Sequence, residues 1–493
     1  MRFPTPHTTL FAVLLIAAAA TWLVPAGQYE SLRYSAEEQS LILASPDAEL
    51  RLAPTQATLD SLGMPTRIAQ FTDGQLTRPV KVPDTYRRLE PSGQGPIDLV
   101  FAAIKGTYEA IDIILLVMMI GGFIRIYNTS GVLQVGIRRL AHRFQGHERW
   151  LIVLLTTLMA AGGTTFGLGE ETIAFYPILV PIFLAAGYDR LVPVAVIFAG
   201  SQFGIVASTV NPFSVIIASD AAGVSWDSGI ALRIAMLVLG LAALIAYTLR
   251  YAERVRRDPS LSLVSEEERN EHLPYSIDIP AGSGDLTWRQ TAMLTLFGAT
   301  FVVMIAGITW FGWWMLEMSA LFLASGVLSG VLLGLDEKTL VHEFVAGASE
   351  MVGVALIIGL ARGVTLLMND GQIIDTVLFA ASSAVAGVPD SFFLTSLVVV
   401  FFALGLLISS TSGLALVTMP ILGALAVSNG IAGESIVTSY VFGAGLMQLI
   451  APTGLVLPTL AMANLKLSTW LRFILPLMGI LFVIAAGLLV IGG

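Results

Sequence analysis

Cysteine is absent from this chain of 493 residues, histidine occurs only five times, and charged residues make up only 12%. Without cysteine the chain has no disulfide framework, thiolate metal site or thiol nucleophile. An average soluble domain has roughly a quarter charged residues. This shortage of charge, together with 55% hydrophobic residues and a mean hydropathy of +0.80, excludes a soluble enzyme and a disordered chain and indicates a protein that lies in lipid.

Catalytic motifs are missing as well. The pair His342-Glu343 lacks the second histidine of the His-Glu-x-x-His zinc motif, and the chain has no Walker loop. The pair Ser412-Gly413 is similar to a membrane serine protease site, but no histidine falls within a predicted apolar segment. We therefore expect neither an enzyme nor an ATP-driven pump, and no cofactor.

The apolar segments predict a polytopic helical membrane protein. All eight tryptophans fall at or near the ends of these segments, and indole rings prefer the headgroup level of a membrane. The segments are approximately 8–24, 111–127, 149–186, 191–219, 229–250, 290–312, 316–335, 351–368, 392–427, 436–464 and 470–491.

Charge in the short loops predicts the orientation, because Lys and Arg concentrate in cytoplasmic loops. Loops 128–149 and 250–257 carry four arginines each. Loops 220–228 and 369–391 carry aspartates and no Lys or Arg. The N-terminus is therefore predicted in the cytoplasm and the C-terminus on the extracytoplasmic side.

The polar stretches divide the chain into two parts. We predict a first half at 1–252 and a second half at 290–493, joined by a cytoplasmic linker at 253–289 that contains three consecutive glutamates. Segment 25–96 is too polar to cross a membrane and is predicted as an extracytoplasmic insertion.

The first apolar segment has two interpretations. Arg2 followed by an apolar run and small residues is typical of a secretory signal peptide. Trp22 and the sequence Pro25-Ala26-Gly27 at its end favour a helix that is retained.

Segments 149–186 and 392–427 are predicted to form re-entrant hairpins. Each arm of the first has roughly 14 residues, or about 21 Å of helix, whereas the hydrocarbon core is about 30 Å thick. The first arm of the second segment is longer, so a true span stays open there. Both tips are rich in Gly, Ser and Thr, and irregular backbone at membrane depth must be buried in protein or line a watery cavity. The tips therefore predict a site, with close helix packing as the alternative.

An internal repeat relates each residue n to about n + 240. Gly106-Thr107-Tyr108-Glu109 matches Gly347-Ala348-Ser349-Glu350, and the two hairpin tips also correspond. The predicted topology runs segment 111–127 inward and segment 351–368 outward, so the copies are inverted. Inverted repeats are typical of secondary transporters with a site near the midplane. The predicted fold class is an all-α polytopic membrane protein with two inverted repeats, each containing a re-entrant hairpin and a broken transmembrane helix.

Segments 191–219 and 436–464 are the predicted broken helices. The first breaks at Ser208-Thr209-Val210-Asn211-Pro212 and the second at Ala451-Pro452-Thr453-Gly454, because proline removes an amide donor from the helix. The exposed ends of half-helices favour carboxylates at N-termini and Na⁺ at C-termini. A proline kink without a ligand is the alternative.

Three charged residues stand inside apolar segments: Glu170, Glu171 and Arg362. Charged groups at membrane depth are costly and usually functional. The glutamates could carry a proton, help bind Na⁺ or face a substrate amino group, and a structural ion pair with Arg125 or Arg362 is the alternative. Arg362 could hold a substrate carboxylate through two hydrogen bonds or serve as the structural counter-ion of the hairpin.

The motifs resemble those of a known family. They are Leu23-Val24-Pro25-Ala26-Gly27-Gln28-Tyr29, Gly163-Thr164-Thr165-Phe166-Gly167, Glu170-Glu171-Thr172-Ile173-Ala174-Phe175-Tyr176-Pro177 and Ser208-Thr209-Val210-Asn211-Pro212-Phe213-Ser214. They are similar to the YfcC branch of the DcuC-type anaerobic C4-dicarboxylate carrier family, within the ion transporter superfamily. The likeness covers nearly the whole chain, and residues 30–95 are its least familiar part.

The resemblance implies a homodimer in a bacterial-type inner membrane, in which a hairpin-bearing transport domain moves as an elevator against a scaffold domain. Related carriers use Ser, Asn and Thr at hairpin tips and helix breaks to bind Na⁺ and carboxylate. By matching position, this places in the site Thr164, Thr165, Ser208, Thr209, Asn211, Ser410, Thr411, Ser412 and Thr453. The candidate Na⁺ ligands among them are Ser208, Thr209, Asn211 and Thr453. The second break has Pro-Thr-Gly where the first has Asn-Pro, so two cation sites need not be equivalent.

We therefore expect a cation-coupled secondary transporter of a small carboxylate-bearing metabolite, with Na⁺ or H⁺ as the coupling ion. An amino acid is the favoured substrate, because Glu170 and Glu171 offer a partner for an ammonium group. The resemblance implies that it could be a basic one such as arginine or ornithine. A C4-dicarboxylate is the alternative substrate, and a channel or a non-transporting receptor is the alternative of another class. The expected partners are the small-molecule substrate, the lipid bilayer and a second copy of the chain, without nucleic acid.

Overall fold

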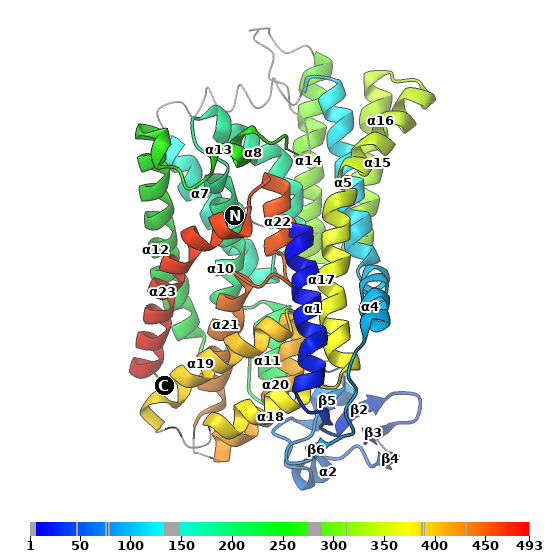
Figure 1. Cartoon of the computed structure of the whole chain (residues 1–493), viewed down its shortest axis with the longest axis vertical. Helices are drawn as coiled ribbons and strands as arrows, with labels where there is room; N and C mark the ends of the chain where they lie inside the picture. The colour runs from blue at the N-terminus through cyan, green and yellow to red at the C-terminus, as the bar shows by residue number, and fades with distance from the viewer. Residues whose placement is uncertain are drawn as a thin grey trace.

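Helices dominate the computed structural model, and most of them run along its long axis (Figure 1). It describes every residue except 1–5, 46–47, 74–75, 77–78, 133–147, 274–287, 312, 386–387, 389, 429–430 and 493. In the first part of the chain the helices are α1 (Pro6–Leu23), α2 (Gln56–Ser61), α3 (Ile68–Thr72), α4 (Pro96–Glu109), α5 (Ile111–Thr129), α7 (Glu148–Phe166), α8 (Tyr176–Ala185), α9 (Leu191–Val194), α10 (Gly200–Val206), α11 (Ile217–Ala221) and α12 (Ile230–Arg257). In the second part they are α13 (Glu266–Asn270), α14 (Trp288–Phe311), α15 (Met315–Leu333), α16 (Glu337–Glu350), α17 (Val352–Asp370), α18 (Ile374–Val385), α19 (Asp390–Leu407), α20 (Thr411–Ser428), α21 (Gly433–Gln448), α22 (Val456–Ala463) and α23 (Leu467–Gly492).

Tighter and wider helical turns interrupt the first half. A 3₁₀ turn, η1 (Glu170–Phe175), connects α7 to α8, and a second, η4 (Pro259–Leu261), follows α12. The π-helical turns η2 (Ala195–Ala199) and η3 (Pro212–Ile216) lie on either side of α10. Such π turns are frequent at functional sites.

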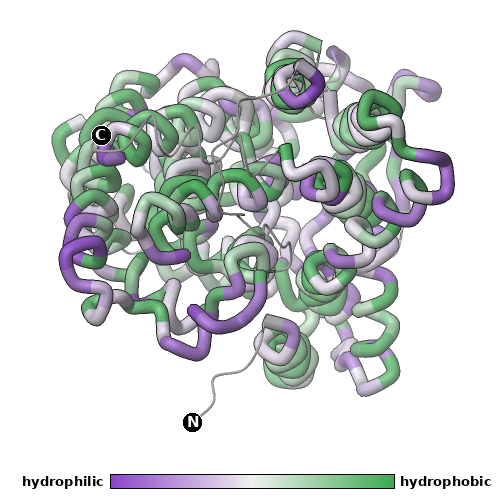
Figure 2. The backbone as a smooth tube through the Cα atoms, turned by 90° about the horizontal axis from the view of Figure 1, so that it is seen from above, coloured by the Kyte–Doolittle hydropathy of each residue, from purple (hydrophilic) through white to green (hydrophobic). Residues whose placement is uncertain are grey.

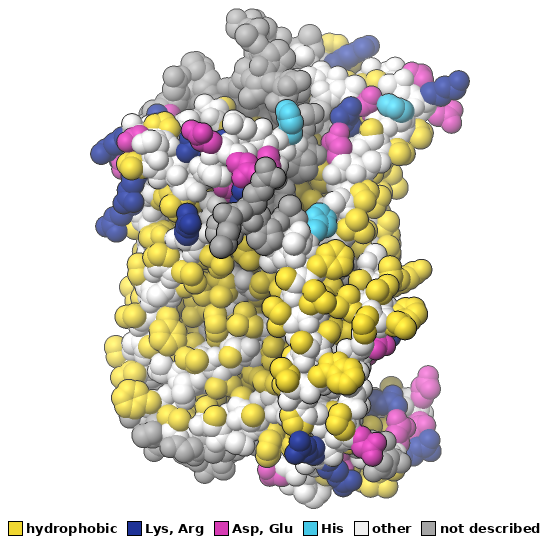
Figure 3. Space-filling model, viewed as in Figure 1, with side chains coloured by type: hydrophobic (Ala, Val, Ile, Leu, Met, Phe, Trp, Pro, Cys, Tyr) yellow, Lys and Arg dark blue, Asp and Glu magenta, His cyan; other side chains and the backbone are white. Residues whose placement is uncertain are grey.

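Six helices of the described part are long and apolar enough to cross a membrane: α5, α12, α14, α15, α17 and α23. Hydrophobic side chains form a belt around the middle of the molecule, and charged side chains gather toward its two ends (Figure 3). The predicted segments 111–127, 229–250, 351–368 and 470–491 coincide with four of these helices to within one residue at each end or lie inside them. The protein is therefore a multi-pass helical membrane protein, as its sequence predicts.

The membrane orientation stays a prediction. Arg138, Arg139 and Arg143, which contribute to the positive charge of loop 128–149, lie outside the described residues. Helix α12 continues to Arg257 and so extends past the predicted start of the linker at residue 253.

One tryptophan does not lie where the membrane-interface interpretation places it. Trp470 is fully buried, and its indole Nε1 donates a hydrogen bond to the carbonyl oxygen of Leu449 over 2.8 Å. For Trp470 the interpretation is wrong, because a position at the end of an apolar segment does not show whether a side chain faces lipid or protein. Trp314 packs on Phe213, with 4.9 Å between ring centroids, and is 43% exposed. The largely exposed tryptophans include Trp22, Trp150, Trp288 and Trp310.

The insertion at 25–96, for which no fold was predicted, contains short strands. They are β1 (Gly27–Gln28), β2 (Ser31–Ser35), β3 (Ser40–Ala44), β4 (Glu49–Leu52), β5 (Val80–Lys81) and β6 (Arg87–Arg88). Four of them form an antiparallel sheet in the order β4-β3-β2-β5, and β1 pairs with β6. This small unit lies at one end of the molecule (Figure 1).

The insertion is fixed to α18 through both charge and aromatic packing. The Nζ atom of Lys81 lies 2.7 Å from a carboxylate oxygen of Asp375. The ring of Tyr86 stacks on Phe379 with 4.3 Å between centroids. A second contact reaches α11 of the first half, because the Gln70 amide donates to the Asp220 carboxylate over 3.2 Å.

Two groups of helices stand side by side, and each group takes helices from both halves of the chain (Figure 1). The first group contains α1, α4, α5 and α14 to α17. The second contains α7 to α12 and α19 to α23. Seen from above, much of the helical backbone is hydrophobic, and many of the hydrophilic segments lie in turns at the helix ends (Figure 2).

Packing within the first group is reciprocal, as expected for a repeat. Helix α4 packs on α17, and α16 packs on α5. A Cβ atom added to Gly106 would lie 2.3 Å from the backbone nitrogen of Gly363, and one added to Gly347 would lie 2.4 Å from the carbonyl oxygen of Gly121. Gly106 and Gly347 are matching positions of the repeat, so both copies use a glycine for the same close helix crossing.

The last helices of the two halves, α12 and α23, lie antiparallel. Leu232 near the start of α12 lies beside Gly492 at the end of α23, and the Tyr247 hydroxyl donates to the carbonyl oxygen of Phe473 over 2.8 Å. Both observations are consistent with inverted repeats. The sequence did not predict α4 and α16, whose mixed polar and apolar composition falls outside the apolar segments.

Candidate functional site

A cavity of about 460 Å³ lies between the two helix groups. Its charged lining residues are Glu109, Asp112, Glu170 and Arg362. Its uncharged polar side chains are Gln202, Ser409, Ser410, Thr411, Ser412, Gln448 and Thr453. The first group contributes residues of α4, α5 and α17, and the second contributes both hairpins and both helix breaks.

Six of the predicted site residues line this cavity: Glu170, Arg362, Ser410, Thr411, Ser412 and Thr453. They are far apart in the sequence and meet because both hairpin tips face the same space between the helix groups. The other predicted residues, Thr164, Thr165, Ser208, Thr209, Asn211 and Glu171, are not among its lining residues.

The polar side chains at the first helix break are bonded to the end of α7. The Thr164 hydroxyl donates to the carbonyl oxygen of Ala207 over 2.6 Å and accepts from the amide of Thr209 over 3.0 Å. The Asn211 side chain donates to the Gly163 carbonyl over 3.3 Å and accepts from the amide of Phe213, two residues further on, over 2.9 Å. These bonds satisfy the backbone groups that a broken helix leaves free.

Two further hydroxyls of this region bond to a carbonyl three or four residues earlier in the chain. The Thr165 hydroxyl donates to the carbonyl of Ala161 over 2.6 Å, and the Ser208 hydroxyl donates to the carbonyl of Ile205 over 2.8 Å. The predicted Na⁺ ligands Ser208, Thr209 and Asn211 therefore all have protein partners, and their role as ligands stays a prediction.

The second helix break is arranged differently. The Gln448 side chain at the end of α21 donates to the carbonyl of Ser409 at the hairpin tip over 2.6 Å. The Thr411 hydroxyl donates to the carbonyl of Phe213 over 3.0 Å, which joins the second hairpin to η3 of the first half. Thr453 lies in the break itself, and its buried hydroxyl has no hydrogen-bond partner in the protein. A buried hydroxyl without a partner is costly, and a ligand in the cavity offers one.

The adjacent glutamates of the first hairpin have different surroundings. Glu171 is 4% exposed, and its carboxylate accepts from the amide of Gly169 over 2.9 Å, so it stabilises the tip. Glu170 lies on the cavity wall. Among the ion pairs of the described residues, none joins either glutamate to Lys or Arg.

The two arginines proposed as structural partners bond to other carboxylates. Arg125 pairs with Glu343 over 2.8 Å and with Glu350 over 2.7 Å. Arg362 lies 3.4 Å from Glu109, the residue that matches Glu350 in the repeat. No ion pair of the described residues joins either arginine to Glu170 or Glu171. Arg362 lines the same cavity as Glu170, and its role as counter-ion of the hairpin stays a prediction.

The charge around the cavity is unequal. Glu109, Asp112 and Glu170 offer three carboxylates, and Arg362 offers one guanidinium. Because Glu109 already faces Arg362, the carboxylates of Asp112 and Glu170 have no ion-pair partner among the described residues. The cavity can thus receive a molecule with one negative group beside Arg362 and at least one positive group beside the acids.

Several cavity residues escaped sequence reasoning. Gln202 and Gln448 were detectable, because an amide side chain in an otherwise apolar segment is unusual. Asp112 stands at the edge of an apolar segment, where a charged residue is expected at the membrane interface. Phe213 and Trp314 carry no distinguishing signal, since their positions over the cavity depend on how η3 meets the start of α15.

A polar, charged cavity between two groups of apolar helices is the arrangement of a multi-pass membrane transporter. The comparison with known sequences is more specific. Residues 3–492 match the C4-dicarboxylate anaerobic carrier family, DcuC, and the chain belongs to that family.

Two relatives match along nearly their whole length. One is an uncharacterized protein of Haemophilus influenzae, 40% identical over 492 residues that cover 99% of this chain and 97% of the relative. The other is an Escherichia coli protein named "Putative basic amino acid antiporter YfcC", 30% identical over 506 residues that cover 98% of this chain and 96% of the relative.

Two solved structures show a distant likeness. The YdaH transporter of Alcanivorax borkumensis has a TM-score of 0.41 at 16% identity, and the comparison covers 99% of this chain and 98% of YdaH. MtrF of Neisseria gonorrhoeae, described with a class of antimetabolite efflux pumps, has a TM-score of 0.38 at 16% identity, with 99% and 95% covered.

Proposed function

We propose that this protein is a cation-coupled secondary transporter of a basic amino acid or a closely related molecule that carries one carboxylate and at least one cationic group. The observation that carries the proposal is the charge arrangement of the cavity, one guanidinium with three carboxylates. The name of the Escherichia coli relative, a basic amino acid antiporter, supports the same substrate class.

The substrate carboxylate binds beside Arg362 in this proposal. A guanidinium forms two parallel hydrogen bonds with a carboxylate, which fixes its orientation. Helix α20 begins at Thr411, so its N-terminus, with the partial positive charge of the helix dipole, also faces the cavity. Substrate then competes with Glu109 for Arg362, which lies 3.4 Å from that carboxylate and is close enough to exchange partners.

The cationic end of the substrate faces Glu170 and Asp112. Both carboxylates line the cavity and lack an ion-pair partner among the described residues. An ammonium or guanidinium group would neutralise them at membrane depth, where an uncompensated charge is costly. A C4-dicarboxylate, the alternative substrate that the family name suggests, brings a second negative charge to this end and is disfavoured.

The coupling ion is Na⁺ or H⁺. No cluster of three or more acidic or histidine side chains that could hold a metal occurs in the described part of the chain. A Na⁺ site would therefore be built from hydroxyl and carbonyl oxygens, and the Thr453 hydroxyl at the second break is the strongest side-chain candidate. Proton coupling would instead use Glu170.

Uptake into proteoliposomes tests the substrate and the coupling ion. Labelled arginine, ornithine, a neutral amino acid and succinate are supplied in turn, with Na⁺ and pH gradients imposed separately. We expect saturable uptake of the basic amino acids that responds to one of the gradients and shows counterflow. Preferential succinate uptake would replace the proposal by the dicarboxylate alternative. Flux that does not saturate would indicate a channel, and binding without flux would indicate a receptor.

The proposed mechanism is an elevator in a homodimer, in which the hairpin-bearing group moves against the other group. The position of the cavity at the boundary between the two groups supports it, because sliding at this boundary would carry the substrate along. Cysteines introduced at Thr165 and Ser412 test the geometry with membrane-impermeant reagents. We expect labelling from opposite sides of the membrane with opposite ligand dependence. Labelling of both from one side in every condition contradicts the inverted hairpins.

A further inference from the structure

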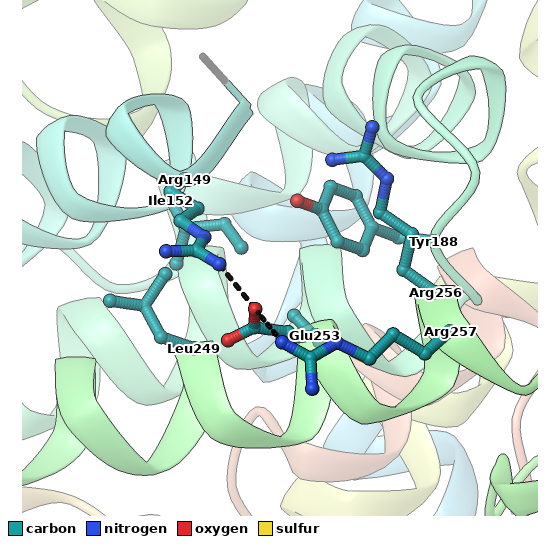
Figure 4. A pocket seen from close by; sticks show the side chains of 8 residues that line it. Arg149, Ile152, Tyr188, Leu249, Glu253, Arg256 and Arg257 are labelled. Atoms are coloured by element: carbon teal, nitrogen blue, oxygen red, sulfur yellow. Dashed lines mark hydrogen bonds and ion pairs between the residues drawn. The ribbon is translucent and has the colours of Figure 1, made fainter. Parts of the chain in front are cut away.

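A second cavity of about 290 Å³ lies between the start of α7 and the last turns of α12. It shares no lining residue with the substrate cavity. Arg149, Arg256 and Arg257 surround it, and the Tyr188 hydroxyl points into the space between the arginines (Figure 4). Glu253 is the acidic residue in its lining.

The arginines are only partly neutralised. Arg256 forms two hydrogen bonds with the buried carboxylate of Glu148, at 2.9 and 3.1 Å. Arg149 and Arg257 donate to the same carboxylate oxygen of Glu253, so two guanidiniums share one negative charge. A guanidinium has five N–H donors, and the side chains of Arg149 and Arg257 are 66% and 77% exposed. The cavity therefore has a surplus positive charge and free donors.

Part of the wall of this cavity is apolar. Ile152, Leu249 and Ala252 line it together with the arginines. Further along α7, Leu154 and Leu158 are more than half exposed and continue the apolar surface toward the middle of the helix. Lys and Arg side chains stand at this end of the molecule, above the hydrophobic belt (Figure 3).

A separate observation places the cavity at the headgroup level of a membrane. Trp150 follows Arg149 directly and is 66% exposed. Exposed tryptophans at helix ends prefer the interface between headgroups and acyl chains. A ligand at this depth meets both guanidinium groups and aliphatic side chains.

We propose that this cavity binds the phosphate headgroup of an anionic phospholipid, with its glycerol and upper acyl carbons against Ile152 and Leu249. Arginine forks match phosphate oxygens, and basic pockets between transmembrane helices are suited to anionic headgroups. The apolar wall favours a lipid over free phosphate, which has no group to place there. The site is independent of the transported substrate.

The test uses the full-length protein in a neutral detergent. Dioctanoyl phosphatidylglycerol, dioctanoyl phosphatidylcholine and inorganic phosphate are added in turn, and the unfolding temperature is followed by tryptophan fluorescence. We expect phosphatidylglycerol to raise it by about 3 °C at saturation, and the other two to have little effect. An equal rise with phosphatidylcholine would overturn the requirement for an anion. An equal rise with inorganic phosphate would overturn the lipid as the source.

The double variant Arg149→Gln/Arg257→Gln removes the two arginines that share Glu253. Arg256 is left in place because it pairs with a buried carboxylate. Each arginine near a membrane surface contributes about a fivefold factor in affinity for anionic lipid, so we expect apparent affinity to fall about 25-fold. The lipid-free unfolding temperature of the variant, measured alongside, reports whether the fold itself is weakened.

The matched control is Arg250→Gln/Arg254→Gln, which removes the same charge from exposed positions of α12 outside the cavity lining. This control should keep wild-type affinity for phosphatidylglycerol. An equal loss in both double variants would show general charge attraction and overturn the site. An Arg149→Lys/Arg257→Lys variant should retain an intermediate affinity, because it keeps the positive charges and loses the planar guanidinium groups.

Discussion

At the first helix break the polar side chains are bonded to protein, and at the second they line the cavity between the helix groups. Thr164, Thr209 and Asn211 join the break after α10 to the end of α7. At the break after α21, Gln448 makes the corresponding link to the hairpin tip, while the hydroxyl of Thr453 stays without a protein partner. The two copies thus share a backbone arrangement and differ in what their side chains do.

This difference teaches that a repeated architecture can divide its chemistry unequally. The first copy supplies Glu170, and the second supplies Arg362 together with the hydroxyls of the hairpin tip from Ser409 to Ser412. A substrate with two unlike charged ends fits such a cavity, because the two copies present unlike groups. A symmetric pair of identical sites would suit a symmetric ligand.

The largest predicted effect concerns the close helix crossings that the two copies share. Gly106→Ala and Gly347→Ala each place a Cβ within 2.4 Å of backbone atoms on a neighbouring helix. Overpacking of a close crossing should destabilise each variant by about 3 kcal/mol. Yield of monodisperse protein and its unfolding temperature in detergent measure the effect.

Gly353→Ala on α17 is the matched control, since nothing lies within 4 Å of its added Cβ. It should be as stable as the wild type or more so, because alanine is the better helix former. If one of the two crossing glycines tolerates alanine and the other does not, the packing of the two copies is not equivalent.

The unequal chemistry of the first hairpin is tested by its adjacent glutamates. Glu170→Gln removes a cavity charge and should lower arginine uptake about 10- to 100-fold, the value of a lost charged hydrogen bond. In Glu171→Gln the amide oxygen can still accept from Gly169, so uptake should stay within a few-fold of wild type. Equal uptake by the two variants in proteoliposomes would remove the role assigned to Glu170.

Two threonine variants, one at each helix break, test the difference between the breaks. Thr453→Val removes a buried hydroxyl that has no protein partner, so stability should hold or rise while transport falls about tenfold. Thr209→Val removes hydrogen bonds to Thr164 and should lower stability by about 1 kcal/mol. Unfolding temperature and uptake are measured on both. The same pattern in both variants would contradict the difference between the breaks.

The smallest effect concerns the start of α23. Glu268 of the linker accepts hydrogen bonds there from the Lys466 amide and the Thr469 hydroxyl. Burial raises the pKa of the Glu268 carboxyl, but hydrogen bonds from Ser265, the Lys466 amide and Thr469 outweigh it and hold that pKa below its usual value. The pKa of Glu268 is therefore lower in the folded protein than in the unfolded chain, where it is about 4.3. The ionised carboxylate stabilises the fold above that unfolded-state pKa, and this stabilisation is lost as the pH falls through the folded-state pKa.

Glu268→Gln should therefore cost about 1 kcal/mol at pH 7, and its difference from wild type should shrink below about pH 4. Glu266→Gln, at an exposed position of the same helix, is the control and should change little at either pH. Thermal unfolding across this pH range measures both variants. A difference that stays constant with pH would exclude the ionised carboxylate as the cause.

Sequence reasoning reached the spans, the hairpin tips and the breaks, because apolar length, glycine and proline act locally. It also singled out Glu170 and Arg362, which both line the cavity, since a charge inside an apolar run is visible without a structure. It did not find the partners of the arginines. Arg125 bonds to Glu343, which is 218 residues away, and no local pattern specifies that pair.

Sequence also could not separate neighbours of the same type. Glu170 and Glu171 are equally conspicuous, yet one lines the cavity and the other bonds to the amide of Gly169. The 3₁₀ geometry of η1 decides which carboxylate faces which way. The strands of the insertion were missed for a related reason, since each is only two to five residues long.

The sequence by itself determined that this chain lies in a membrane, where its helices break, and which charges it carries at depth, because the exclusion of polar backbone from lipid constrains every residue of a span. The tertiary structure decided that both hairpins meet Arg362 and Asp112 in one cavity. It also decided which hydroxyls are satisfied by protein and which remain for a ligand. Those outcomes depend on contacts between segments hundreds of residues apart, whose energies no local pattern contains.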